Sequence, residues 1–304
     1  MAFRLRDDLD RDVILLRPPR RIVSLVPSDT LTLFDLGAGD RIVGRTRYCI
    51  EPAGRVDGIA TVGGTKDPDI DAICELGPDL ILGNAEENTR KALEALARRN
   101  QILFVSFPRR VGDGIAHMAR LARMLEVHDE PGARQLVRRG YQVVREAEAA
   151  VAEVSPVPTF VPIWMDPLMT FRNDTYADDM LSLVGATNVF EGRKRYYPLA
   201  ADLGTADPLS DAEVGARDTR YPRISLDEVV SKAPQLVLLP DEPHEFSDSD
   251  KEVFDALDIP AASHGCVWFC DGKDLFWHGS RAVDAIGRLR ALVDSARNPG
   301  ADPD

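Results

Sequence analysis

The chain has 304 residues, a net charge of −13 and 44% apolar residues, which is the composition of a globular protein long enough for two domains. The acidic charge and the lack of any Lys/Arg run argue against binding to nucleic acid or to an anionic membrane surface. No apolar run approaches the roughly 18–20 residues of a transmembrane helix, so membrane insertion is not expected.

Residues 1–21 are dotted with charge and lack the apolar core of a signal peptide. We therefore expect a cytoplasmic protein, or a periplasmic one if a leader has been removed. The four cysteines show no C-x-x-C spacing and predict neither a redox motif nor a metal cluster. Cys49, in a loop, is the one cysteine that we consider functional.

The first part of the chain alternates apolar strands with helices, which indicates a mostly parallel sheet. The predicted strands lie at 21–26, 41–44, 80–83 and 102–107, and the predicted helices at 27–36, 69–76 and 89–99.

From 111 to 154 there is no strand signal. We expect a helix at 115–125 and a second helix at 131–154, which starts at a proline in a favourable first-turn position. At about 1.5 Å per residue the second helix is long enough to cross a whole domain.

The alternation then resumes. The predicted strands lie at 159–164, 235–239 and 267–270, and the predicted helices at 176–184, 226–232 and 280–295. Residues 191–222 are polar and rich in Gly, Asp and Pro, and predict an insertion or a mobile flap.

Two segments of the chain repeat one pattern. Residues 70–82 and 226–238 both predict a short helix, a proline and an apolar strand, with Asp71 and Asp227 in matching first-turn positions. The match continues into the next loop, as far as Glu242. Two copies are too few for a solenoid and predict two similar lobes with a ligand cleft between them.

The predicted fold is therefore α/β, with two similar parallel-sheet lobes joined by a long backbone helix. The N-terminal lobe would span 1–111, the connecting helices 112–154 and the C-terminal lobe 155–304.

Three segments resemble a known family: 21–28, 36–44 and 78–82. They are similar to the helical-backbone metal-receptor family, which includes the vitamin B12-, haem- and siderophore-binding components of ABC importers. The resemblance extends from residue 8 to residue 297. It implies the class III periplasmic-binding-protein fold.

Other segments resemble a leaderless branch of this family that is often labelled cobalamin-binding: 62–66, 86–88, 163–170 and 277–279. The chain departs from the branch at Asp10-Arg11, where a Gly-Arg turn is usual, and in the longer segment 191–222. The resemblance implies cobalamin or another metal chelate as the ligand.

In parallel sheets, ligands gather at the carboxyl ends of the strands, so the loops there are expected to hold the ligand-binding side chains. The candidates are Pro27, Ser28, Tyr48, Glu86, Glu87, Asn88, Trp164, Met165, Asp166, Met169, Glu242, Trp277, His278 and Arg281.

Several of these residues have two interpretations. Glu86 and Glu87 either cap the next helix or bind a metal or the polar groups of a chelate. Trp277 and His278 either pack under a helix or supply an aromatic wall and an axial imidazole ligand. A metal site would use His278, Glu86 and Cys49.

Trp164, Met165 and Met169 suit a flat apolar ligand such as a corrin, or pack between the lobes. Arg281 would contact an anionic group of the ligand.

In the importer proteins of the family, an acid in each lobe docks on arginines of the membrane permease. The resemblance therefore implies that Asp71 and Asp227 dock on an ABC permease. The alternative is that both acids stabilise a helix N-terminus.

Nothing in the chain pairs a nucleophile with a base, and no phosphate-binding loop is present, so we do not expect an enzyme. The predicted function is a small-molecule binding protein that holds a cobalamin-type corrinoid in the inter-lobe cleft. The alternatives are binding of a siderophore, of haem or of a bare zinc or iron ion. From another class, the alternative is a cytosolic metal-dependent enzyme or metallochaperone.

Overall fold

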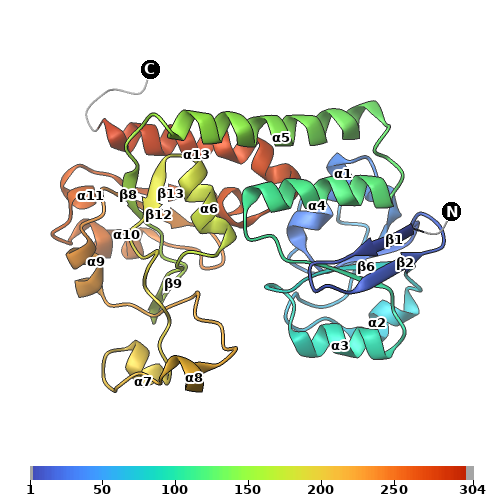
Figure 1. Cartoon of the computed structure of the whole chain (residues 1–304), viewed down its shortest axis with the longest axis horizontal. Helices are drawn as coiled ribbons and strands as arrows, with labels where there is room; N and C mark the ends of the chain where they lie inside the picture. The colour runs from blue at the N-terminus through green and yellow to red at the C-terminus, as the bar shows by residue number, and fades with distance from the viewer. Residues whose placement is uncertain (1–2, 299–304) are drawn as a thin grey trace. The chain divides into compact units, whose positions relative to one another are not determined.

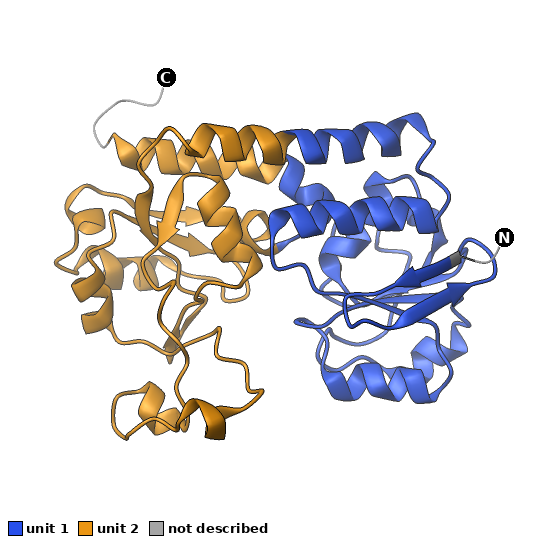
Figure 2. Ribbon diagram, viewed as in Figure 1, with its two compact units in different colours: residues 1–142, 277–283 blue, residues 143–276, 284–304 orange. Residues whose placement is uncertain are grey.

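The computed structural model of the protein describes residues 3–298 and divides the chain into two compact units (Figure 2). Unit 1 contains Met1–Gln142 and Trp277–Val283, and unit 2 contains Val143–Phe276 and the chain from Asp284 onward. We call Trp277–Val283 the return segment, because the chain comes back through it to unit 1. The sequence predicts that these residues belong to the C-terminal lobe.

Unit 1 is built on a five-stranded sheet of order β5-β4-β3-β6-β7, in which all neighbours are parallel. The predicted alternation of strands and helices is confirmed. The strands are β3 (Ile22–Ser24), β4 (Ile42–Arg45), β5 (Ala60–Thr61), β6 (Leu80–Asn84) and β7 (Leu103–Ser106). The helices are α1 (Pro27–Asp35), α2 (Ile70–Glu75), α3 (Arg90–Arg98) and α4 (Val111–Met124), with a 3-10 turn η1 (Gly39–Arg41).

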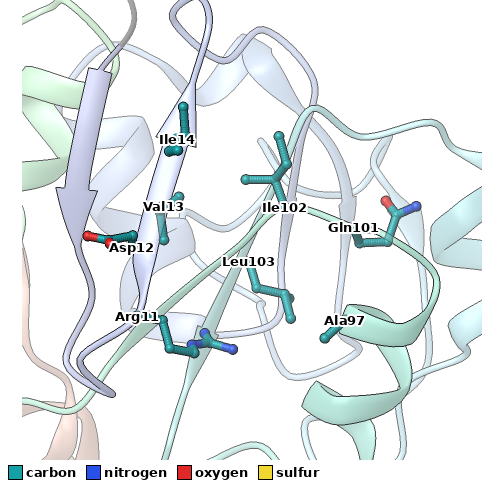
Figure 3. Close-up of a pocket in the computed structure, with 8 residues that line it drawn as sticks. All are labelled: Arg11, Asp12, Val13, Ile14, Ala97, Gln101, Ile102 and Leu103. Carbon is teal, nitrogen blue, oxygen red and sulfur yellow. The ribbon is translucent and has the colours of Figure 1, made fainter.

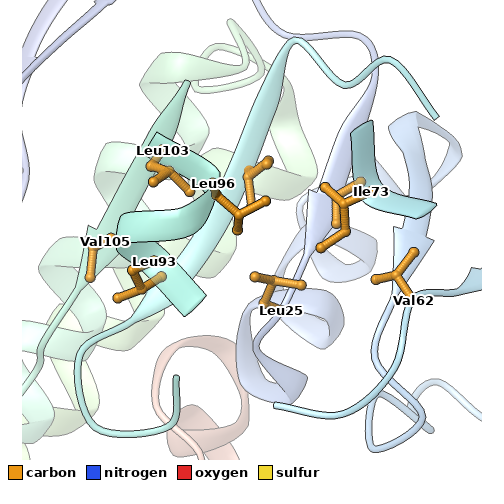
Figure 4. Packing of buried hydrophobic residues seen from close by; sticks show 9 residues of the cluster. Leu25, Val62, Ile73, Leu93, Leu96, Leu103 and Val105 are labelled. Carbon is orange, nitrogen blue, oxygen red and sulfur yellow. The ribbon is translucent and has the colours of Figure 1, made fainter. Parts of the chain in front are cut away.

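The core of unit 1 lies between this sheet and helices α2 and α3 (Figure 4). Strands β3 and β6 are buried along their whole length, as expected for central strands of a parallel sheet covered on both faces. The helices contribute Ile73, Leu93 and Leu96, which pack against the strands. This packing explains why both strands read as continuous apolar runs in the sequence.

An N-terminal hairpin was missed in the sequence. Strands β1 (Phe3–Arg6) and β2 (Asp12–Leu15) pair antiparallel. The buried carboxylate of Asp7 holds the turn, since it accepts the backbone N–H groups of Leu9 and Arg11, both at 3.0 Å. Asp10 has a left-handed φ of 59°. The resembled branch has glycine at this position. Asp10 adopts the left-handed conformation that glycine favours, so the turn is still formed.

Unit 2 is built on a four-stranded parallel sheet of order β11-β8-β12-β13, with a small antiparallel pair beside it. Its strands are β8 (Val157–Phe160), β9 (Trp164–Met165), β10 (Leu168–Met169), β11 (Ala186–Asn188), β12 (Leu236–Pro240) and β13 (Val267–Cys270). Its helices are α6 (Tyr176–Leu183), α7 (Leu199–Asp202), α8 (Asp211–Val214), α9 (Leu226–Lys232), α10 (Asp248–Asp255), α11 (Pro260–Ser263) and α12 (Gly272–Phe276).

The predicted strand at 159–164 was wrong in its extent. Strand β8 ends at Phe160, and Trp164 belongs to the separate pair β9–β10. Pro162 lies between them and has no N–H group for the sheet ladder, which ends the strand.

The predicted insertion at 191–222 contains the short helices α7 and α8 (Figure 1). Arg193 anchors it: its guanidinium donates to Asp202 at 3.2 Å and to Glu228, on α9, at 2.8 Å. The segment is therefore tied to the rest of unit 2 by a half-buried ion-pair network.

Helix α5 (Pro131–Val151) is one continuous helix, as predicted, and the boundary between the units falls inside it. Its N-terminal part packs closely on α4, since a Cβ added at Gly140 would lie 3.0 Å from Ile115. In its C-terminal part the carbonyl of Ala147 accepts from Arg290 at 3.2 Å. Arg290 lies on α13 (Ala282–Arg297), which follows the 3-10 turn η2 (Gly279–Arg281) of the return segment.

The internal repeat is confirmed as a repeat of structure. Both α2–β6 and α9–β12 are helix–strand units. The strand orders β4-β3-β6-β7 and β11-β8-β12-β13 have the same topology. Gly37 after α1 and Gly185 after α6 both adopt positive φ, of 78° and 83°. The two units are therefore two copies of one fold.

The repeat yields a test at the ends of α2 and α9. Gly77 and Ala233 occupy matching positions, and both are left-handed, with φ of 54° and 45°. A Cβ at Gly77 meets nothing within 4 Å, so the backbone alone decides the effect. We expect Ala233→Gly to raise the free energy of unfolding by about 1 kcal/mol and Gly77→Ala to lower it by a similar amount. Urea denaturation measures both changes. Shifts of the same sign would contradict the assignment.

Candidate functional site

In unit 1 the candidate residues follow the carboxyl ends of three neighbouring strands. Pro27 and Ser28 form the first turn of α1 after β3, Tyr48 and Cys49 follow β4, and the 86–88 turn follows β6. Because these strands are parallel, their loops emerge at one edge of the sheet. Pro27 and Ser28 are buried, whereas Tyr48 is 52% exposed.

Two asparagine side chains hold the 86–88 turn. Asn84 accepts the backbone N–H groups of Glu86 at 2.8 Å and of Glu87 at 3.1 Å. The buried amide of Asn88 accepts from the backbone of Asn84 at 2.8 Å and donates to the carbonyl of Thr65 at 2.9 Å. Asn88 therefore positions the turn, which carries the half-buried side chains of Glu86 and Glu87.

Lys66 lies beside this turn and was not among the predicted residues. Its ammonium group donates to the carbonyl of Glu86 at 2.5 Å. Burial lowers the pKa of Lys66, while Glu87 and Glu86 act in the opposite direction. Glu86, Glu87 and Lys66 thus bring two carboxylates and one amine together. Such a set suits both hydrogen-bond donors and hydrogen-bond acceptors of a ligand.

Cys49 is fully buried, and its sulfur lies 3.2 Å from the hydroxyl of Thr46. Burial raises the pKa of its thiol, which disfavours the thiolate that binds metals. Its surroundings are those of a core residue.

The return segment packs against α1 and α4 within unit 1. Trp277 and His278 are both buried, with exposed fractions of 6% and 4%. The backbone N–H of Ser280 donates to the hydroxyl of Thr32 at 3.2 Å. Arg281 is half-buried.

Within unit 1, His278 lies in a buried cluster with two residues that the sequence analysis missed, Asp29 and His117. Nε2 of His117 lies 2.8 Å from Oδ1 of Asp29, and Nδ1 of His278 lies 3.8 Å from the same oxygen. Among the described residues, this is the group of side chains close enough to share a metal ion, and neither Glu86 nor Cys49 is part of it. A weak signal was present in the sequence, because His117 is a polar residue inside the apolar pattern of α4.

The charge state of this cluster follows from burial and proximity. Burial alone would raise the pKa of Asp29, but the nearby His117 and His278 lower it overall. Burial lowers the pKa of His278 to about 4. At neutral pH the cluster therefore contains a carboxylate and, at His278, an uncharged imidazole.

In unit 2, Trp164, Met165, Asp166 and Met169 all lie in or beside the β9–β10 pair. Trp164 stands opposite Met169, and its indole N–H donates to the carbonyl of Asp166 at 3.0 Å. The Trp164 side chain is nevertheless 44% exposed. The pair thus presents an aromatic surface that is positioned by its own turn.

His244 extends this surface, and the buried ring of Phe246 packs against it. His244 follows β12 in the same loop as Glu242, and its ring lies 5.2 Å from that of Trp164 and 4.7 Å from that of Phe246. Sequence reasoning singled out Glu242 in this loop through the repeat, but the first copy offers no aromatic residue to draw attention to His244. We call Trp164 and His244 the aromatic surface of unit 2.

Asp71 and Asp227 lie in the first turns of α2 and α9, and both are exposed. The carboxylate of Asp71 accepts from Arg99 at 2.7 Å. Their positions in the first turns fit stabilisation of the helix N-terminus, and their exposure at matching positions of the two units fits docking on a partner.

A hollow of about 240 Å³ lies in unit 1 between β2 and the end of α3 (Figure 3). It is lined by Val13, Ile14, Ile102 and Leu103, with Arg11 and Gln101 among its polar residues. None of the candidate residues lies in it, so it is separate from the loops described above.

The sequence profile of the family described as "Periplasmic binding protein" matches residues 22–257. The chain belongs to this family. Its members are substrate-binding proteins, and the class III fold that the resemblance implied is confirmed.

Among similar proteins, the vitamin B12-binding protein of Yersinia pestis (strain Pestoides F) is 24% identical over 251 residues, which cover 82% of this chain and 79% of that protein. The periplasmic vitamin B12 binding protein of Vibrio cholerae has a similar structure, with a TM-score of 0.72, 20% identity, and coverage of 92% of this chain and 99% of that chain. A periplasmic heme binding protein from Pseudomonas aeruginosa matches with a TM-score of 0.69, 19% identity, and coverage of 90% and 92%.

Within the described residues, no helix has both the length and the apolar character needed to cross a membrane. The family is described as periplasmic, and so it does not support the cytoplasmic location expected from residues 1–21.

The packing of the return segment can be tested at Gly279. Its φ is 79°, and an added Cβ would lie 2.4 Å from the hydroxyl of Thr32. Gly54, also in unit 1, has the same φ of 79°, but nothing lies within 4 Å of an added Cβ. We expect Gly279→Ala to lower the free energy of unfolding by about 1–3 kcal/mol more than Gly54→Ala does. Equal losses in thermal or urea denaturation would show that the contact with Thr32 does not constrain the segment.

Proposed function

We propose that this protein binds a cobalamin-type corrinoid. The proposal is supported by the similarity to a protein named vitamin B12-binding, which extends over 82% of the chain. A corrinoid is a flat macrocycle with apolar edges and a rim of amide groups, so its site needs an aromatic surface and polar groups that can both accept and donate hydrogen bonds.

The observation that carries the proposal is the aromatic surface of unit 2. Trp164 is the largest side chain of this surface and is 44% exposed, although indole rings are usually well covered in folded proteins. The ring cannot turn freely, because its N–H group is bonded to Asp166. A fixed, exposed aromatic ring provides contact area at a low cost in conformational entropy.

The polar part of the proposed site is the 86–88 turn of unit 1. The carboxylates of Glu86 and Glu87 would accept N–H groups from the corrin side chains, and Lys66 would donate to their carbonyl oxygens. Asn84 and Asn88 fix the backbone of this turn before any ligand binds, which reduces the ordering cost of binding. The location of the ligand in a cleft between the lobes stays the prediction made from the repeat.

In this proposal the protein carries its ligand and does not convert it. Asp71 and Asp227 would then serve as docking points for an ABC permease, one in each unit. Their exposure and their matching positions support that role.

Haem is the second candidate ligand. The observation that favours it is His244, whose imidazole lies 5.2 Å from the Trp164 ring, because histidine is a common axial ligand of haem iron. Light absorption separates the two ligands, since haem gives a Soret band and a corrinoid gives the bands of its own macrocycle.

Calorimetric titration with cobalamin tests the proposed site. Trp164→Ala removes the aromatic wall, and we expect it to weaken binding by about 2 kcal/mol or more, as loss of an aromatic hot spot does. Two control variants should leave the affinity unchanged. Tyr141→Ala removes another aromatic residue, which is 40% exposed and lies on α5. Asp71→Ala removes a proposed docking residue.

Two results would contradict this assignment. If Asp71→Ala abolished binding while Trp164→Ala retained it, the proposed site would lie on the wrong part of the protein. If the unmodified protein gave no heat with cobalamin but bound haem, the second candidate would replace the first.

A further inference from the structure

The geometry of unit 1 points to a second site, for a divalent transition-metal ion. We propose that Asp29, His117 and His278 bind such an ion, for which zinc is the probe. One potential ligand atom from each residue lies within 4.8 Å of the other two, and all three side chains are buried. The inference does not depend on corrinoid binding, because the contacts proposed for the corrinoid come from the aromatic surface of unit 2, the 86–88 turn and Lys66, whereas the ion would use His278, a candidate from the sequence, with Asp29 and His117.

The donor set fits the ion. Two imidazole nitrogens and one carboxylate oxygen are the ligands that zinc and its neighbours in the first transition row prefer in proteins. Three protein ligands leave a fourth position of a tetrahedral ion for water.

The distances are close to those needed. Ligand atoms about 2.0–2.1 Å from a tetrahedral ion stand roughly 3.3 Å from one another. In the cluster the separations run from 2.8 Å, between His117 and Asp29, to at most 4.8 Å. Small side-chain rotations would bring all three into range.

Asp29 provides an independent indication. Its carboxylate is 1% exposed, and its second oxygen, Oδ2, has no hydrogen-bond partner among the described residues. Burying an unsatisfied carboxylate oxygen is costly. A metal ion would satisfy the carboxylate.

The ring of His117 already faces the proposed site. Its Nε2 lies 2.8 Å from Oδ1 of Asp29, and its Nδ1 lies 3.5 Å from the guanidinium of Arg120. Nε2 is therefore the nitrogen that would bind the ion. Asp8 holds the guanidinium of Arg120 with two hydrogen bonds, of 2.7 Å and 3.1 Å.

The ion would join three parts of unit 1 that are far apart in the sequence. Asp29 lies on α1, His117 on α4, and His278 in the return segment just before η2. A bound ion would therefore fasten the return segment to the two helices, in addition to the hydrogen bond between Ser280 and Thr32.

Zinc titration of the whole chain tests the inference, with zinc content measured after dialysis. We expect one zinc per chain, and at least a hundredfold weaker binding in Asp29→Asn and in His117→Gln, which keep side-chain size but remove a ligand. His128→Gln is the matched control, since His128 is an exposed histidine of the same unit. It should bind zinc like the unmodified protein.

Crystals of the unmodified protein grown with zinc give a readout that needs no variant. An anomalous scattering peak among Asp29, His117 and His278 is expected, and it decides the question even if a variant fails to fold. Absence of the peak, full retention of zinc by both ligand variants, or loss of zinc in His128→Gln would overturn the inference. Cobalamin affinity measured on the same samples separates the two proposals, because either ligand can fail while the other still binds.

Discussion

Parallel pairing of the strands is the constraint on which the chemistry of each unit depends. All four neighbouring pairs in the sheet of unit 1 run parallel, and so do the three pairs in the main sheet of unit 2. Parallel strands must be connected by crossovers, and their carboxyl ends all meet at one edge of the sheet. This rule places the 86–88 turn and the loop that holds His244 at the edges of their sheets, and hydrogen bonds of Asn84 and Asn88 then fix the 86–88 turn.

The same constraint explains what the sequence could reveal. Strands β6 and β12 are buried on both faces, so they appear as unbroken apolar runs between a helix signal and a polar loop. Because the pattern occurs twice, with Asp71 and Asp227 in register, it predicted two related units as well as the elements within them. The candidates in the 86–88 turn and in the loop after β12 could be named for the same reason, since they lie just after a predicted strand.

Two of the missed features depend on contacts between residues far apart in the chain, and a third depends on the burial of one side chain. In the sequence, Asp29 is an ordinary acidic residue in the first turn of a helix. Its contact with His278 forms only because the return segment folds back into unit 1. His244 has no counterpart in the first copy of the repeat, and only its stacking beside Trp164 marks it. The β1–β2 hairpin depends on one buried carboxylate, Asp7, which local sequence patterns do not distinguish from its exposed neighbours.

The two proposed sites use different physical means. The aromatic surface of unit 2 remains partly exposed and would contribute apolar area, while the Asp29–His117–His278 cluster is buried and contributes charge and lone pairs. A large flat ligand suits the first and a bare ion suits the second. Native mass spectrometry of the protein mixed with equal amounts of cobalamin and haem tests the central claim most directly. The account predicts one cobalamin per chain and little haem. A haem complex, or protein that carries neither ligand, would contradict it.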